Sequence, residues 1–222
     1  MRFLITCDKK FTKLHMEKSF IESYSSFCGE RTQEVFTQCV ERSAFFSAIL
    51  EDDKVIAFNF HRIIELKDGE THLYLEGVPE SFLETIRNKH RVLTTEFLTV
   101  ASSHRGQFTK MQPADLLVGI NMHFMKNSIC TAIMGYSRQD IKTDRISMKM
   151  GTRSMGTVER FGIPCSIVFA EDYSVVNHPL KKMQERIEEL WTTRINNAPH
   201  LERIPTWTSE EKSKAPDNIS TA

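Results

Sequence analysis

Several familiar signatures are missing from this chain of 222 residues. Lysine plus arginine and aspartate plus glutamate both number 29, so the formal net charge is zero. This balance argues against a protein that holds nucleic acid through bulk positive charge. No apolar run is long enough to span a membrane, and the first residues turn polar too early for a secretion signal. We therefore expect a cytoplasmic protein with neither a membrane span nor a nucleic-acid partner.

The motifs of metal-dependent hydrolases and of serine hydrolases are missing as well. The sequence has no His-Glu-x-x-His spacing, so we expect no metal site, and it has no Gly-x-Ser-x-Gly turn. The five cysteines, an odd number, contain no Cys-x-x-Cys pair and stand mostly among apolar neighbours. They are typical of reduced core cysteines in a cytoplasmic protein, with a catalytic cysteine as the alternative.

One segment points directly at a ligand. Residues 95–101 are typical of a strand, a short polar turn with Arg105 and Gly106 follows, and a helix begins near Pro113. Free backbone N–H groups and the positive end of a helix dipole suit an anion at such a place. The Walker sequence is missing here, and the three-glycine dinucleotide fingerprint keeps only Gly106. A plain turn is the alternative interpretation.

The segment resembles the central motif of the GNAT acyltransferases. That motif has a strand with a hydrophobic-x-Val pattern and then Arg-Gly-x-Gly-x-Gly/Ala leading into a helix. The matching positions are Leu98, Val100, Arg105 and Gly106. The sequence departs from the pattern at Phe108 and Lys110, where the family has glycine and glycine or alanine.

The flanking segments extend the resemblance. The expected elements are a hairpin over 46–60, a helix over 113–126, a buried strand over 129–136, a helix over 140–150 and a strand over 166–169. The resemblance implies an α/β (α+β) fold of the GNAT type, with a mixed, mostly antiparallel sheet flanked by helices. We expect one domain over 1–204 and a flexible tail over 205–222, which has little apolar content.

An insertion before the central strand narrows the resemblance. Residues 72–78 indicate an extra strand, residues 79–90 indicate a short helix, and Glu96 opens the central strand. This arrangement is similar to the branch of N-acyl amino acid synthases and acyl-homoserine-lactone synthases. Members of that branch often use an acyl carrier protein as the donor.

The resemblance implies an N-acyltransferase that acts by direct transfer, as a monomer or a homodimer. The donor is acetyl-CoA, a longer acyl-CoA or an acyl carrier protein thioester, and the acceptor is a small-molecule amine. Main-chain groups of the central strand would bind the pantetheine arm, at Leu98, Thr99 and Val100. The following loop would bind the phosphates through Arg105, Gly106, Gln107, Phe108, Thr109 and Lys110.

The resemblance to the GNAT acyltransferases also indicates candidate acid and base residues. Glu96 is the predicted general base, because an ammonium must lose a proton before it attacks a thioester. An ordinary strand-end charge is the alternative for Glu96, and His61, His72 and His104 are alternative bases. We expect His61 to face outward and His104 to contact solvent. Ser147 stands where the family has its acidic tyrosine, and a serine hydroxyl is a poor acid.

Two rival interpretations stay open. The departures at Phe108, Lys110 and Ser147 also fit a degenerate module that binds a thioester or a protein partner without catalysis. An unrelated α/β protein is the third possibility.

Overall fold

The computed structural model describes residues 1–105, 112–141 and 143–197 of the chain. The strands are β1 (Arg2–Thr6), β2 (Phe45–Glu51), β3 (Lys54–His61), β4 (Ile63–Glu65), β5 (Arg91–Val100), β6 (Ala132–Arg138), β7 (Arg153–Arg160), β8 (Ile163–Glu171) and β9 (Ile195–Asn197). The α-helices are α1 (Lys9–Cys28), α2 (Thr32–Arg42), α3 (Glu80–Ile86), α4 (Pro113–Lys126), α5 (Asp144–Met148) and α6 (Lys181–Thr192). Short 3-10 turns are η1 (Gly29–Arg31), η2 (Leu73–Leu75), η3 (Ser102–His104) and η4 (Asp172–Ser174).

All the described strands form one sheet with the order β7-β8-β6-β5-β3-β2-β1-β9, and β4 pairs with β5 beside this path. Most neighbours are antiparallel, but β5 pairs with β6 in parallel, and β1 pairs with β9 in parallel. The β5–β6 pairing begins at Val92 opposite Ala132 and ends at Thr95 opposite Gly135. Beyond that point β5 stays with β3 while β6 stays with β8. The sheet therefore splits between β5 and β6 along the second half of each strand.

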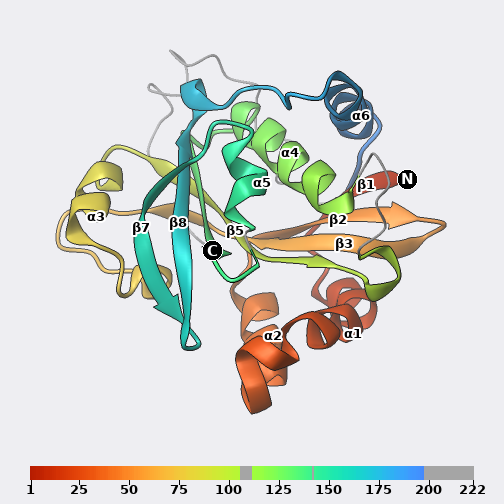
Figure 1. The fold of residues 1–222 in the computed structure, drawn as a ribbon, viewed down its shortest axis with the longest axis horizontal. Helices are drawn as coiled ribbons and strands as arrows, with labels where there is room; N and C mark the ends of the chain where they lie inside the picture. The colour runs from red at the N-terminus through yellow and green to blue at the C-terminus, as the bar shows by residue number, and fades with distance from the viewer. Residues whose placement is uncertain (106–111, 142, 198–222) are drawn as a thin grey trace.

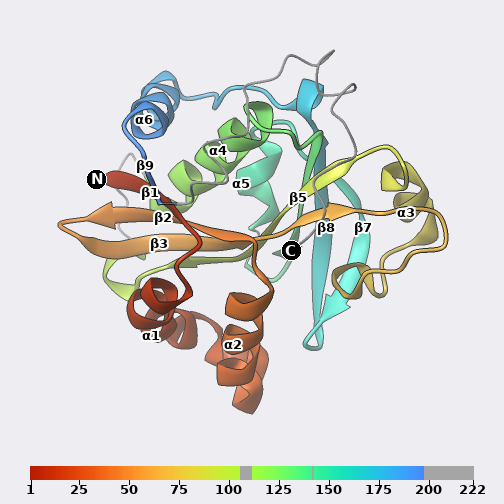
Figure 2. The ribbon, with the colours of Figure 1, turned by 180° about the vertical axis from the view of Figure 1, so that it is seen from behind.

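Helices cover both faces of the sheet. Helices α1 and α2 lie against one face, and α4, α5 and α6 lie on the other, as the two opposite views show (Figures 1 and 2). Each face has its own apolar core, because side chains of successive strand residues point to opposite faces. Val92 of β5 belongs to the core under α1 and α2, and Leu93 belongs to the core under α4 and α6.

A bulge interrupts β5 just where it leaves β6. Phe58 of β3 pairs with Thr99, and Phe60 pairs with Glu96, so two residues of β5 oppose one residue of β3. Phe97 takes up the extra length with a φ of 51°, in the left-handed region that a bulky residue rarely adopts. The bulge bends the strand and directs both Glu96 and Phe97 toward the α1 and α2 face.

The architecture confirms the predicted fold class and corrects parts of its detail. The hairpin and the helix over 113–126 are present, the latter with the predicted bounds. Residues 72–78 form no strand, since they hold the 3-10 turn η2, and the helix over 140–150 shortens to α5. Strand β7 was not predicted, because Arg153–Arg160 alternates poorly and mostly faces outward. Residues 205–222, the predicted tail, lie outside the described part of the chain.

Within the described ranges, the structure contains no helix long and apolar enough to cross a membrane.

Candidate active site

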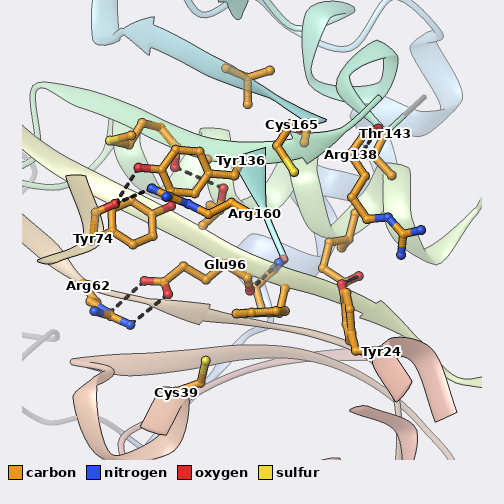
Figure 3. Close-up of a pocket in the computed structure, with 18 of the residues that line it drawn as sticks. Tyr24, Cys39, Arg62, Tyr74, Glu96, Tyr136, Arg138, Thr143, Arg160 and Cys165 are labelled. Atoms are coloured by element: carbon orange, nitrogen blue, oxygen red, sulfur yellow. Dashed lines mark hydrogen bonds and ion pairs between the residues drawn. The ribbon is translucent and has the colours of Figure 1, made fainter. Parts of the chain in front are cut away.

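A cavity of about 450 Å³ lies at the split between β5 and β6. Its lining includes Tyr24, Cys39 and Tyr136, which belong to the core under α1 and α2. It also includes Val118 and Met122, which belong to the core under α4 and α6. The cavity therefore passes through the sheet and connects its two faces. Figure 3 shows the part around Glu96, where side chains from several elements converge.

Glu96 is a buried carboxylate on the wall of this cavity, with 7% of its surface exposed. The Arg62 guanidinium lies 2.9 Å from Oε1 through Nε and donates from Nη2 to Oε2 at 2.9 Å. The Thr94 hydroxyl donates to Oε1 at 3.1 Å. Burial raises the pKa of Glu96 to about 7 against the opposing effects of Arg62 and Thr94. A carboxyl group with this pKa can both accept and release a proton near neutral pH.

The three predicted main-chain contacts of β5 occupy different surroundings. Leu98 lines the cavity, and its carbonyl accepts a hydrogen bond of 2.6 Å from the Tyr24 hydroxyl. Thr99 and Val100 continue the strand past the split and pair with Phe58 and Ala57 of β3. Thr99 and Val100 are not among the described residues that line the cavity. From Glu96 onward the opposite edge of β5 has no strand partner among the described residues.

Only the first residue of the predicted phosphate loop is described. Arg105 is exposed, donates from Nε to the Val100 carbonyl at 2.7 Å and contacts the Ser23 hydroxyl. Gly106, Gln107, Phe108, Thr109 and Lys110 lie outside the described residues. Helix α4 begins directly after this loop, at Pro113, which suits the first turn of a helix.

Ser147 lies in the cavity wall, where its hydroxyl makes a hydrogen bond within its own helix. Its buried hydroxyl donates to the Asp144 carbonyl at 3.1 Å, within the short helix α5. Its only proton is therefore used in a local hydrogen bond.

Sequence reasoning missed the tyrosines of the site. Tyr24, Tyr74 and Tyr136 all line the cavity, so three of the four tyrosines in the chain gather there. The Tyr136 hydroxyl donates to the Tyr74 carbonyl at 2.5 Å, and the two rings pack with centroids 4.8 Å apart. No sequence signal connects them, because they come from α1, η2 and β6, which only the fold brings together.

The histidine expectations were partly wrong. His61 is fully buried and does not face outward, because the bulge-bearing β3–β5 pair is covered by α4 on that face. Its Nδ1 lies 2.9 Å from the Thr94 carbonyl, and its Nε2 lies 2.7 Å from the Ser47 hydroxyl. Since a carbonyl only accepts, Nδ1 carries the proton. His104 does not simply contact solvent, since its Nε2 lies 3.0 Å from Glu51.

Burial lowers the pKa of His61 to about 4, below its ordinary value of 6.5. Between pH 6.5 and 4 the unfolded chain therefore binds a proton at His61 that the folded chain does not, so acidification removes stability. We expect the wild type to lose roughly 3 kcal/mol relative to His61→Gln over this range. Urea unfolding of both proteins at pH 7 and pH 4 measures this difference. A difference that does not change with pH would contradict the burial of a neutral imidazole.

The cysteines and the acidic residues form no second candidate site in the described part of the chain. The five cysteines are not joined by disulfides, and burial raises the pKa of the Cys39 and Cys165 thiols on the cavity wall. A raised pKa keeps a thiol protonated and inert, as expected for reduced core cysteines. Among the described residues, no group of three or more histidines, cysteines or acidic residues is placed to hold a metal ion.

Comparison with solved structures identifies the fold. No protein-family model and no curated protein matches the sequence. The chain is similar to FeeM, an N-acyl amino acid synthase from uncultured soil microbes, with a TM-score of 0.56 and 10% identity over 88% of this chain and 100% of that one. It is also similar to a mosquito arylalkylamine N-acetyltransferase-like protein, with a TM-score of 0.52 and 11% identity over 76% of this chain and 99% of that one.

An acyl-CoA N-acyltransferase from Pseudomonas aeruginosa gives a TM-score of 0.50 at 11% identity, over 76% of this chain and 99% of that one. The described chain therefore has the GNAT fold, as its central motif predicted.

Proposed function

We propose that the protein is an N-acyltransferase that moves an acyl group from a thioester directly to an amine. The observation that carries this proposal is the cavity that crosses the sheet at the β5–β6 split, with Glu96 on its wall. A donor entering on the α4 face and an acceptor entering on the α1 and α2 face would meet in the split. No covalent enzyme intermediate is needed, because both reactants share one cavity.

The donor is acetyl-CoA, a longer acyl-CoA or an acyl carrier protein thioester. Its pantetheine arm would run along the edge of β5 that has left β6, and would pair with the main chain of Leu98–Val100 like an added strand. The loop at 105–110, which leads into α4, would hold the phosphates. An amide N–H of β5 would polarise the thioester carbonyl.

Glu96 is proposed to take a proton from the acceptor ammonium. The amine nitrogen then attacks the thioester carbon, the C–N bond forms, and the C–S bond breaks. As the C–S bond breaks, the nitrogen gives up a second proton and the departing thiolate takes one up, so the products are an amide and a free thiol, and one net proton stays on Glu96. Ser147 is a poorer source of this proton than a phenol, because a serine hydroxyl is the weaker acid. Tyr24, whose hydroxyl donates to the Leu98 carbonyl on the cavity wall, is proposed to supply it.

A binding module without turnover is the second candidate. The engaged hydroxyl of Ser147 favours it, because the family acid is then replaced by a group with no free proton. In that case the cavity would hold a thioester, and Glu96 would serve only as a buried partner of Arg62.

Thiol release and thermal unfolding together test the proposal. Purified protein is incubated with acetyl-CoA or longer acyl-CoAs and a panel of primary amines, and free thiol is followed with a chromogenic reagent. We expect amine-dependent thiol release, and a rise in unfolding temperature with the preferred acyl-CoA. Gly106→Val should remove that rise. Thermal stabilisation without thiol release for any amine would favour the binding module, and neither response with CoA or carrier-protein thioesters would overturn both candidates.

A further inference from the structure

Two main-chain carbonyls of β5 face the open edge of the strand beyond the split. On the other edge, the Ala101 N–H donates to the Ile56 carbonyl at 2.8 Å, next to the pairing of β5 with β3. The C=O and N–H groups of one trans peptide point in opposite directions, so the Val100 carbonyl points to the open edge. Strand alternation gives the Leu98 carbonyl, two residues earlier, the same direction. These two carbonyls are therefore the acceptors that an added strand would meet.

Both carbonyls already accept a hydrogen bond from a side chain of the protein. The Tyr24 hydroxyl of α1 donates to the Leu98 carbonyl at 2.6 Å, and Arg105 Nε donates to the Val100 carbonyl at 2.7 Å. Arg105 also contacts the hydroxyl of Ser23, the residue next to Tyr24. Figure 3 shows Tyr24 on the α1 side of β5, with its hydroxyl end directed at the strand. We name the pair of Tyr24 and Arg105, in these contacts, the edge latch.

The edge latch competes with any ligand that pairs with β5 as a strand would. The N–H groups of such a ligand must come within about 2.9 Å of the same two oxygens that now accept from the latch. A carbonyl that loses one donor must gain another, because an unpaired polar group away from water costs free energy. The latch therefore satisfies the open edge in the free protein, and a ligand must replace it.

Both halves of the edge latch can open while the surrounding core stays packed. Arg105 is exposed, so water can replace its contacts. The Tyr24 ring packs against Phe20 and Phe97, with ring centroids 4.9 Å and 5.1 Å away. These contacts hold the ring, whereas the hydroxyl proton can turn about the C–O bond. The packing thus keeps Tyr24 beside the edge of β5 while its hydrogen bond changes partner.

We infer that the donor opens the edge latch, because its pantetheine arm takes the places of Tyr24 and Arg105 at the Leu98 and Val100 carbonyls. The inference rests on the proposed acyltransferase function and adds an order of events to it. Once displaced, the Arg105 guanidinium can bind the donor phosphates, and the Tyr24 O–H bond can turn toward the departing sulfur. The binding of the donor thus prepares the proton that the thiolate takes up.

Coenzyme A and pantetheine, which has the same arm without the nucleotide and its phosphates, test the edge latch by calorimetric titration. We expect Tyr24→Phe to bind both compounds about two- to tenfold more tightly than the wild type, because one competing hydrogen bond is lost. Arg105→Ala should bind pantetheine more tightly by a similar factor. It should bind coenzyme A more weakly, because the phosphates lose a charged partner. Tyr173→Phe and Arg153→Ala, exposed and outside the cavity, are matched controls that should leave both affinities unchanged.

The stability of the free protein distinguishes the edge latch from a merely structural contact. Tyr24→Phe should unfold at a lower temperature than the wild type without ligand, because the free protein loses a hydrogen bond. Stability and pantetheine affinity should therefore change in opposite directions. A tyrosine that only supports the shape of the site would lose both.

The outcomes also separate the inference from the proposed function. Unchanged or weaker pantetheine binding in either latch variant, with thiol release intact in the wild type, would overturn the inference and leave the acyltransferase standing. Tighter pantetheine binding in both variants, without thiol release from any thioester, would support the latch and count against the function. If pantetheine bound neither the wild type nor the variants, the inference would be overturned as well, since the arm itself must reach the edge of β5.

Discussion

Glu96→Gln is expected to lower kcat/KM for acyl transfer about 100-fold to 10,000-fold, the usual contribution of a general base. The amide keeps the size of the carboxylate, and its oxygen can still accept from Arg62 or Thr94, which bond Glu96 now. It cannot take a proton from an ammonium. Donor binding should persist, because Glu96 lies on the face of the sheet opposite to α4. Thiol release at saturating acyl-CoA measures the loss, and a thermal shift with acyl-CoA measures retained binding.

The pH dependence of the same variant gives the sharper result. A base with a pKa of about 7 must be ionised to act, so wild-type kcat/KM should rise tenfold per pH unit below pH 7 through Glu96 alone. Glu96→Gln should lose this limb and keep any limb that belongs to the acceptor amine. Glu96→Asp should retain a titrating limb with reduced rate, and Glu30→Gln, exposed on η1, should behave as the wild type. An unchanged pH profile in Glu96→Gln would show that Glu96 is a structural partner of Arg62 only.

Local sequence patterns were enough for the elements that carry a strong period. The helix over 113–126 has apolar residues at helical spacing and Pro113 in its first turn, so its bounds could be predicted. Strand β7 could not, because it lies at the edge of the sheet and most of its side chains face outward. The segment at 72–78 has strand-forming residues, but its backbone turns at η2, where Tyr74 and Leu75 are buried in the core under α1 and α2. Tertiary packing decided that segment, and tertiary packing is invisible to a local pattern.

Some residues of the candidate site could be predicted from the sequence, and others could not. Glu96 could be proposed from its place at the start of the central strand, because a family pattern fixes that position. Tyr24, Tyr74 and Tyr136 could not be proposed, since they come from α1, η2 and β6, which are far apart in the sequence. Only the folded chain brings them together on the wall of one cavity.

Gly135→Ala is expected to damage both stability and donor binding, because of where Gly135 lies. It is the last residue of β6 that pairs with β5 before the split, opposite Thr95. A Cβ atom there would lie 2.7 Å from the Thr95 Oγ1 and 2.9 Å from the Thr95 carbonyl oxygen. The hydroxyl can rotate away, but the carbonyl belongs to the backbone of β5, so the two strands must move apart. Overpacking of this kind costs about 1–3 kcal/mol, and each kcal/mol lowers the melting temperature of a chain this size by about 2–4 °C.

The position of the strain distinguishes this variant from an ordinary destabilising one. Strands that separate at the apex of the split change the width of the cavity where the thioester would sit. Gly135→Ala should therefore raise KM for acyl-CoA and reduce the acyl-CoA thermal shift, even at temperatures where the variant is fully folded. The double variant Thr95→Ala/Gly135→Ala separates the two contacts, because it removes the Oγ1 clash and keeps the carbonyl clash. If the double variant restored both stability and donor binding, the Thr95 side chain would be the cause of both losses. If it restored stability but donor binding stayed weak, the separation of the two strands would itself disrupt the site. A Gly135→Ala protein with normal stability and normal acyl-CoA binding would contradict the close approach of β5 and β6 at this point.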